Sequence, residues 1–181
     1  MFSPADILQF WYSAPMKKHW FQSTPEIDAL IRDQYEELWS RAALGELDSW
    51  KESAEGCLAL ILLFDQFPLN MFRGEAKSFS TEAHSIDLSL FGLEQSYDQQ
   101  LRRDQLSFFY MPLMHSELME HQDLSVKMFE QAGLENNLRF AKHHRQIIEQ
   151  FGRFPHRNAI LQRQSTQAET DYLGSKNSFK G

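Results

Sequence analysis

The sequence contains a single cysteine, Cys57, which excludes an internal disulfide bond. Cys57 begins an apolar run that extends to Phe64, so we expect the thiol to pack as a small hydrophobic group. A chain with one unpaired, buried thiol is suited to a reducing compartment, and we predict a cytoplasmic protein.

Long apolar runs are also missing. None approaches the roughly 20 residues that a helix needs to span a bilayer. The first residues, MFSPADILQFWYSAP, show neither the basic segment nor the long apolar segment of a secretory signal. We therefore expect no export and no membrane partner.

Several motifs that carry known chemistry are absent. The sequence has no GxSxG, no GxGxxG, no phosphate-binding glycine loop, no HExxH and no Glu-x-x-His pair. His115 and His121 would lie about 240° apart around a helix, and the adjacent His143 and His144 about 100° apart, so neither pair shares a face. We expect no metal and no cofactor.

Basic residues are fewer than acidic ones, 18 against 25, which gives a net charge of −7. No basic stripe with interleaved aromatic residues is present, and the acidic field repels phosphate backbones. We therefore expect no nucleic-acid partner. Against this background, the cluster Arg153, His156 and Arg157 is a local concentration of positive charge.

The length of 181 residues and the apolar content of 42% are sufficient for one domain, residues 1–181, with its own core. The polar tail from about residue 175 is predicted to be disordered. No segment alternates between apolar and polar residues, as half-buried strands do.

Apolar residues instead recur every three or four positions, which predicts an all-α protein. Helix caps are predicted at Ser3, at Thr24 and in the capping box from Thr166 to Glu169. Helical segments are predicted to stop before Pro15, near Gly45, before Pro68, at Gly92, before Pro112, at Gly133 and at Gly152, with another over 156–163. Such short helices predict antiparallel pairs that stack into a bundle or a short solenoid.

The segment FGRFPHRN, residues 151–158, is the strongest candidate for a binding site. Gly152 can end one helix, and His156 to Asn158 are predicted to begin the next, so backbone amides and the guanidinium groups of Arg153 and Arg157 would surround an anion. The alternative is that these arginines pair with the protein's own carboxylates.

A looser copy of this pattern, FDQFPLNMFRG, occupies residues 64–74 and offers Asp65, Asn70 and Arg73. Asp65 lies at the end of an apolar helix, where an unpartnered carboxylate is costly. It is predicted to act as a base or a ligand contact, or alternatively to form a structural salt bridge with Arg153 or Arg157.

A third group, FFYMPLMHSE at 108–117, combines Tyr110, a predicted ligand contact, with His115 and Glu117 beside a proline. A titratable imidazole near a carboxylate is suited to acid–base chemistry, although Ser116 and Glu117 also fit a helix cap. Trp11 and Trp20 are candidates for the wall of a pocket, with core packing as the alternative.

These blocks, together with Trp20-Phe21 and GELDSW at 45–50, resemble a bacterial family of uncharacterised proteins with a tetratricopeptide-like helical fold. The resemblance covers almost the whole chain and implies an all-α fold in which antiparallel helix pairs stack into a right-handed superhelix or bundle, but it brings no reaction. Leu69 stands where the family pattern commonly has a basic residue, and Gln162 where it commonly has glycine.

Two functions remain open at this point. In the first, a small anionic molecule binds in an interhelical pocket lined by Arg73, Asn70, Arg153, His156, Arg157 and Asn158, with Asp65, His115 or Glu117 as acid–base groups. In the second, the protein is an interaction module that binds an acidic peptide or a C-terminal carboxylate. The sequence leaves open whether any reaction occurs, and also the oligomeric state.

Overall fold

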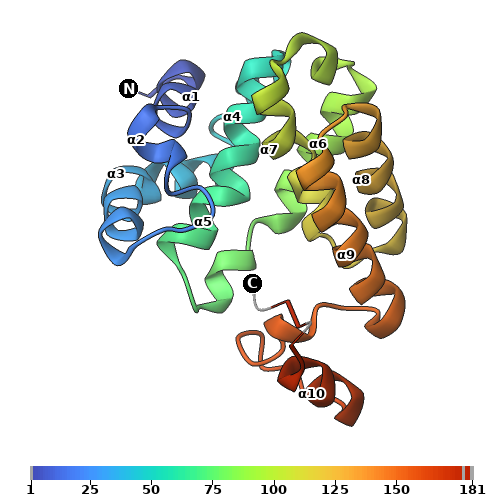
Figure 1. Cartoon of the computed structure of the whole chain (residues 1–181). Coiled ribbons are helices and arrows are strands. Elements are labelled where there is room, and N and C mark those ends of the chain that lie inside the picture. Colours follow the sequence, from blue (N-terminus) through green and yellow to red (C-terminus); the bar gives the residue numbers. More distant parts are fainter. Residues whose placement is uncertain (1, 177, 180–181) are drawn as a thin grey trace. The chain divides into compact units, whose positions relative to one another are not determined.

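The computed structural model describes residues 2–176 and 178–179, and this part of the chain is helical with no strand (Figure 1). The all-α prediction is therefore confirmed. The α-helices are α1 (Pro4–Trp11), α2 (Ala14–Lys17), α3 (Pro25–Ala43), α4 (Ala54–Phe64), α5 (Gln66–Met71), α6 (Glu82–Glu94), α7 (Arg103–His115), α8 (Met119–Gln131), α9 (Glu135–Phe151) and α10 (Gln167–Gly174), and the 3-10 helices are η1 (Asp48–Glu52), η2 (Ala76–Phe79), η3 (Tyr97–Gln100) and η4 (Pro155–Arg157).

The predicted caps form as expected. Ser3 and Thr166 each close a capping box at the start of α1 and α10, and Thr24 accepts from the backbone N–H of Ile27 at the start of α3. Each cap satisfies backbone donors that have no partner within the helix, and so fixes where the helix begins.

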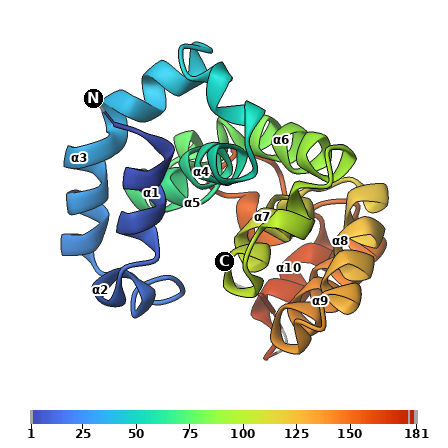
Figure 2. The ribbon, with the colours of Figure 1, turned by 90° about the horizontal axis from the view of Figure 1, so that it is seen from above.

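The chain divides into two compact units, Met1–Pro112 and Leu113–Gly181, with the boundary inside α7. The single domain expected from the length stays a prediction. In the first unit, α4 packs between α1 and α6 (Figure 2). Its residues are buried from Gly56 to Phe64, because this helix is apolar on every side.

Pro68 does not end a helix, contrary to the prediction. The break falls at Asp65, and Pro68 is the third residue of α5. The first four N–H groups of a helix have no partner within it, so proline is tolerated there.

Gly92 does not end its helix either, since α6 continues to Glu94. A Cβ atom at Gly92 would lie only 2.5 Å from Cζ of Phe109, so this glycine allows α6 and α7 to pack closely. Pro112 likewise lies inside α7, which continues to His115 through the buried residues Leu113 and Met114. Burial of the last turn outweighs the hydrogen bond that proline removes.

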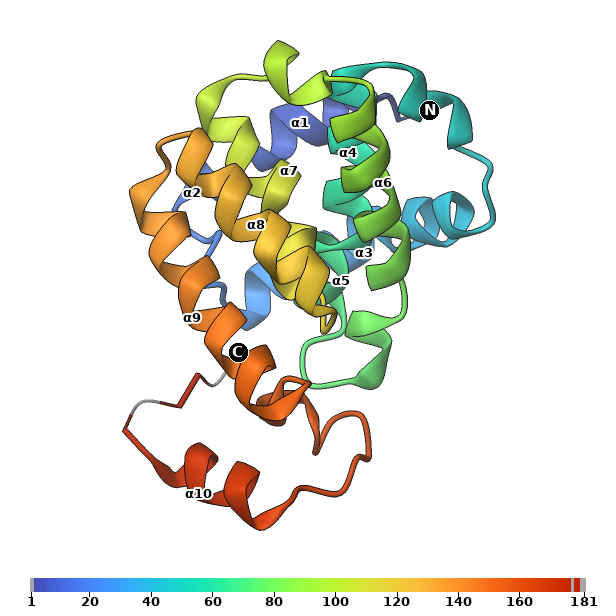
Figure 3. The ribbon, with the colours of Figure 1, turned by 90° about the vertical axis from the view of Figure 1, so that its right-hand side faces the viewer.

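In the second unit, α8 and α9 lie side by side (Figure 3). A cluster formed by Ile147, Ile148 and Phe154 is covered by partly buried residues that include Phe151 and Phe179. Residues 177, 180 and 181 of the tail predicted to be disordered lie outside the described residues. Phe179, within them, packs on this cluster, and its N–H donates to the Tyr172 hydroxyl at 2.9 Å.

The helix predicted over 156–163 is wrong. Residues 155–157 form the short turn η4, and residues 158–162 continue as turns. Gln162 adopts a left-handed conformation with φ 54°, which an α-helix does not accept. The tetratricopeptide-like superhelix stays a prediction. No helix in residues 2–176 is long and apolar enough to cross a membrane.

Candidate functional site

The FGRFPHRN segment forms a corner at the end of α9. Gly152 has φ 70°, a left-handed conformation that glycine adopts without strain, and this ends the helix as predicted. Phe154 then continues in an extended conformation and is fully buried, while Pro155 begins η4. The corner is thus anchored by one aromatic ring, and its polar side chains are held around that ring.

Arg153 is engaged by a carboxylate of the same unit. Its Nε and Nη2 donate to the two carboxylate oxygens of Glu169 at 2.6 and 2.8 Å, and Nη2 also donates to the carbonyl of Gln164 at 2.8 Å. The hydrogen bond from Arg153 is the main reason that the pKa of Glu169 falls to about 2. These bonds favour a structural role for Arg153, the alternative that the sequence left open.

Glu117 is held in a similar way by Arg163. Two guanidinium nitrogens of Arg163 donate to its carboxylate at 2.7 and 2.9 Å, and the N–H of Phe154 donates at 2.7 Å. Burial raises the pKa of Glu117, but these bonds outweigh burial and hold the pKa below its usual range. The carboxylate is a poor proton carrier near neutral pH, which favours a structural role over the predicted acid–base role.

Arg157 and Asn158 are buried, with exposed fractions of 6% and 1%. The Nη2 of Arg157 donates to the carbonyl of His115 at 2.9 Å, and its guanidinium lies 4.7 Å from the ring centre of Phe154. Asn158 donates to the Ser165 hydroxyl at 3.1 Å. Because residues 155–157 form a 3-10 turn, and residue 158 continues as a turn and not as an α-helix, the predicted anion site at a helix N-terminus is not formed here.

The imidazole rings of His144 and His156 pack against the rings of Phe154 and Phe179. The His144 ring centre lies 5.4 Å from that of Phe154, and the His156 ring centre lies 5.0 Å from that of Phe179. Burial lowers the pKa of His144 to about 3 and that of His156 to about 4, with Arg157 adding to the shift of His156. Both imidazoles are therefore neutral at pH 7, so His156 is not the cation that the sequence implied.

The Nδ1 atom of His156 is buried and has no hydrogen-bond partner among the described residues. Buried polar atoms without a partner are rare in folded proteins and cost folding free energy. The corresponding atom of His144, in contrast, lies 2.9 Å from the carbonyl of Phe140.

The predicted residues of the second group lie in the first unit. Asn70 donates to the carbonyl of Gln66 at 2.8 Å and accepts from Arg73 at 3.2 Å, so the structure brings Asn70 and Arg73 together. Arg73 is exposed and also pairs with Asp28 at 2.7 Å. Asp65 is buried and accepts from the side chain of Gln66 at 2.6 Å.

Tyr110, Trp11 and Trp20 also belong to the first unit. The Tyr110 hydroxyl donates to Asp98 at 3.1 Å. Trp11 is fully buried and stacks on Trp20, whose Nε1 donates to the Trp11 carbonyl at 2.9 Å. These contacts favour core packing for Trp11.

Sequence reasoning missed Arg163, His144 and Phe179. His144 follows Ala141 and precedes Ile147 at helical spacing, so the apolar face of α9 was the signal that places it inside the unit. No pattern in the sequence indicated which arginine would pair with which glutamate. Within residues 2–176 and 178–179, no group of three or more His, Cys, Asp or Glu side chains is placed to hold a metal ion.

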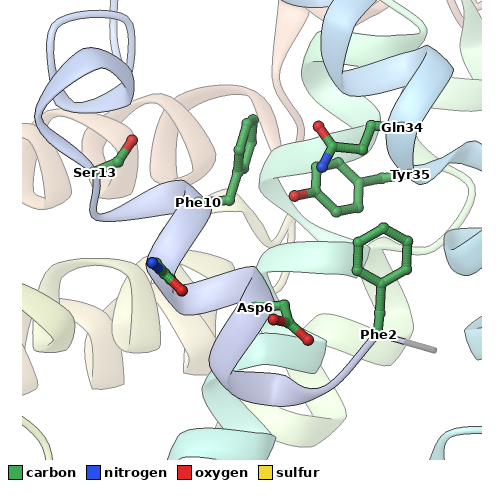
Figure 4. A pocket seen from close by; sticks show the side chains of 7 residues that line it. Phe2, Asp6, Phe10, Ser13, Gln34 and Tyr35 are labelled. Carbon is green, nitrogen blue, oxygen red and sulfur yellow. The ribbon is translucent and has the colours of Figure 1, made fainter.

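Two hollows in the first unit lie beside α1. One, of about 550 Å³, has an aromatic wall and a polar rim (Figure 4). Phe2 and Phe10 lie on either side of the Tyr35 ring, at 5.3 and 4.9 Å between ring centres, and Asp6 and Gln34 lie nearby. The other, of about 510 Å³, is lined by Gln9, Tyr12, Glu55, Arg102 and Gln105, among others.

The residues that the structure describes form an all-helical protein in which two arginines, Arg153 and Arg157, lie in the corner that follows α9. The chain belongs to a family described as bacterial protein of unknown function (DUF924), whose model matches residues 7–177. This confirms the resemblance seen in the sequence.

A solved structure of a protein of unknown function from Agrobacterium tumefaciens, ATU0120, is similar to the chain. The two are 39% identical with a TM-score of 0.89, over 94% of this chain and 96% of the other. A comparison with curated proteins gives no match.

Proposed function

We propose that the protein binds a small anionic molecule at the FGRFPHRN corner, with His156 and Arg157 as the contacting side chains. The observation that carries this proposal is the buried Nδ1 of His156, which has no hydrogen-bond partner among the described residues. A ligand that bonds to this atom would compensate the cost of burying it.

The surrounding charges fit an anion. Burial is the main cause of the low pKa of His156, and the charges of Arg157 and Arg163 lower this pKa further, so both guanidinium groups act electrostatically on the imidazole. The carboxylates of Glu117 and Glu169 each accept two bonds from one arginine, Arg163 and Arg153 respectively. An anion beside a neutral imidazole would accept from an Nδ1–H and gain the attraction of Arg157.

His115 is the acid–base group that we propose for this unit. It lies in the last turn of α7, and its carbonyl accepts from Arg157, one of the two proposed contacts, which supports this choice. Glu117 is less suited because Arg163 holds its carboxylate ionised. The predicted role of Asp65, in the other unit, stays a prediction.

A thermal-shift screen tests this proposal, with inorganic phosphate, sulfate, citrate and a panel of phosphorylated and dicarboxylic metabolites as probes. A ligand present at a hundred times its Kd adds about 2.7 kcal/mol to the free energy of unfolding. We expect at least one probe to stabilise the wild type and to lose that effect in His156→Phe, which keeps a ring against Phe154 and Phe179.

Arg153→Lys is the matched control, because Arg153 is assigned to Glu169 and not to the ligand. It should lower stability without removing the ligand effect. Equal stabilisation of the wild type and His156→Phe would refute the proposed site. Stabilisation by peptides with an acidic C-terminus, and by none of the small anions, would favour the interaction module instead.

A further inference from the structure

The hollow of about 510 Å³ in the first unit contains two unsatisfied polar groups. Nε2 of Gln105 and the hydroxyl of Tyr12 are both buried and have no hydrogen-bond partner among the described residues. Gln105 as a whole is 2% exposed. Native proteins seldom leave such groups unpaired, and here two of them line the same hollow.

The orientation of Gln105 is fixed by its other amide atom. Oε1 accepts from the backbone N–H of Arg102 at 2.9 Å, just before α7 begins. A backbone N–H requires an acceptor, so the carboxamide oxygen must lie on this side and the NH₂ group on the other. Gln105 therefore presents an N–H donor for which the described residues provide no acceptor.

The Tyr12 ring is held firmly by its neighbours. It contacts Trp20 and Phe108 at 5.5 and 6.1 Å between ring centres, and the cations of Lys17 and Arg102 lie 5.9 and 5.6 Å from its centre. Burial, and then the charge of Asp104, raise the pKa of the Tyr12 phenol well above its usual range. The hydroxyl therefore keeps its proton and offers a second donor.

Charged groups of both signs complete the lining. Arg102 is exposed and also lines the hollow, with its Nε bonded to Asp104 at 3.2 Å. Glu55, from α4, is exposed and makes no hydrogen bond or ion pair among the described residues. A hollow with two buried donors, a guanidinium and a separate carboxylate is complementary to a molecule that carries both charges.

We propose that this hollow is a second binding site, specific for a small zwitterion of the amino-acid class. Its carboxylate accepts from Gln105 Nε2 and the Tyr12 hydroxyl near Arg102, and its ammonium group faces Glu55. The volume lies within the range of about 300 to 1,000 Å³ that is common for small-molecule sites. All lining residues belong to the first unit, so this site is independent of the FGRFPHRN corner.

The test is a thermal-shift and calorimetric screen of the twenty standard amino acids, with their methyl esters and N-acetyl derivatives as probes that each lack one charge. We expect at least one amino acid at saturation to raise the Tm of the wild type by roughly 5 °C. Its ester and its acetylated form should bind at least about tenfold more weakly.

Tyr12→Phe removes only the hydroxyl and keeps the ring contacts. Without ligand, its Tm should equal or exceed that of the wild type, because a buried unpaired hydroxyl is lost. With the amino acid, its affinity should fall about tenfold. Gln105→Glu should weaken binding similarly, since it keeps the acceptor for Arg102 N–H and removes the donor.

His156→Phe distinguishes the two sites, because it should bind the amino acid as the wild type does. The proposal is overturned if none of the twenty amino acids stabilises the wild type, or if Tyr12→Phe and the wild type bind with equal affinity.

Discussion

The two Phe-x-x-Phe-Pro segments have the same pattern of residues and fold differently. In the first, Phe64 ends α4, Asp65 keeps a right-handed conformation, and a new helix begins at once. In the second, Phe151 ends α9, Gly152 turns left-handed, and the chain leaves the helix in an extended conformation at Phe154.

What the two segments share is the second phenylalanine, because Phe67 and Phe154 are both fully buried. The pattern therefore specifies an aromatic anchor, whereas the residue after the first phenylalanine decides the path of the backbone. Only glycine adopts positive φ without strain, which explains why the second copy turns sharply and the first does not.

The largest expected effect comes from removing the shared anchors. Phe67→Ala and Phe154→Ala should each lower the free energy of unfolding by about 3 to 5 kcal/mol, since each empties a fully buried aromatic site. Urea denaturation measures this loss. Leu44→Ala is the control, because Leu44 is 79% exposed and its loss should change stability by less than about 0.5 kcal/mol. A small effect at only one phenylalanine would show that the anchors are not equivalent.

The stabilities of the two units should respond differently to acid. His144 is neutral in the folded protein with a pKa of about 3, below its usual value of 6.5, because it is buried. Its contribution to stability is complete above pH 6.5 and is lost as the pH falls towards 3, since only the unfolded chain takes up the proton readily. Between pH 6.5 and 4 the loss is about 3 kcal/mol, at about 1.4 kcal/mol per pKa unit.

The first unit should respond at the opposite end of the pH scale. Burial raises the pKa of Tyr35 and of Tyr110 above the usual value of 10, so their contribution is complete below pH 10 and is lost as the pH rises further. Hydrogen exchange followed by mass spectrometry resolves the two units. His144→Phe should reduce the acid sensitivity of the second unit, and His156, with its pKa of about 4, should account for part of what remains. Equal acid sensitivity in both units would contradict this assignment.

A smaller effect is expected from Gly152→Ala. Nothing lies within 4 Å of a Cβ atom at this position, so the penalty is purely conformational and amounts to about 1 to 2 kcal/mol at φ 70°. Gly174→Ala is the matched control, because that glycine also has open space but lies within α10 and has no positive φ. There alanine should be neutral or stabilising. Equal losses of stability at Gly152 and Gly174 would mean that the positive φ of Gly152 is not the cause of the loss.

The smallest effect is expected from Gln162→Gly, which places glycine at a position with a left-handed backbone conformation. Gln162 is exposed and has φ 54°, so glycine relieves strain, but it also increases the entropy of the unfolded chain. We expect stability to rise by less than about 1 kcal/mol in thermal denaturation. A loss of stability would show that the Gln162 side chain contributes contacts of its own.

Helix identity and helix starts could be predicted from the sequence because they depend on nearby residues. Ser3, Thr24 and Thr166 act on backbone donors within three positions, and Gly152 acts on its own backbone. The errors at Gly92 and Pro112 have a different origin. Tertiary packing determines the conformation at both positions, because Gly92 packs against Phe109 and Pro112 lies beside the buried Leu113. No local pattern in the sequence reveals such contacts.

The same distinction applies to the candidate site. The sequence located the basic corner, because its composition departs from the acidic average. It did not indicate that Arg153 pairs with Glu169 and Arg163 with Glu117, since those partners are 16 and 46 positions apart. Nor did it indicate that the donors of Tyr12 and Gln105 have no partner in the part of the chain that the structure describes, because an unsatisfied hydrogen bond is a property of the folded chain alone.

The single cysteine has a practical consequence. Cys57 is fully buried, its thiol donates to the carbonyl of Leu88 at 3.4 Å, and burial raises its pKa to about 12. Alkylating reagents attack the exposed thiolate, so this side chain should stay unmodified in the native protein. The wild type is therefore a ready background for spectroscopic labelling: a cysteine introduced at any exposed position, such as Leu44 or Leu118, would be the one that carries the dye or the spin label.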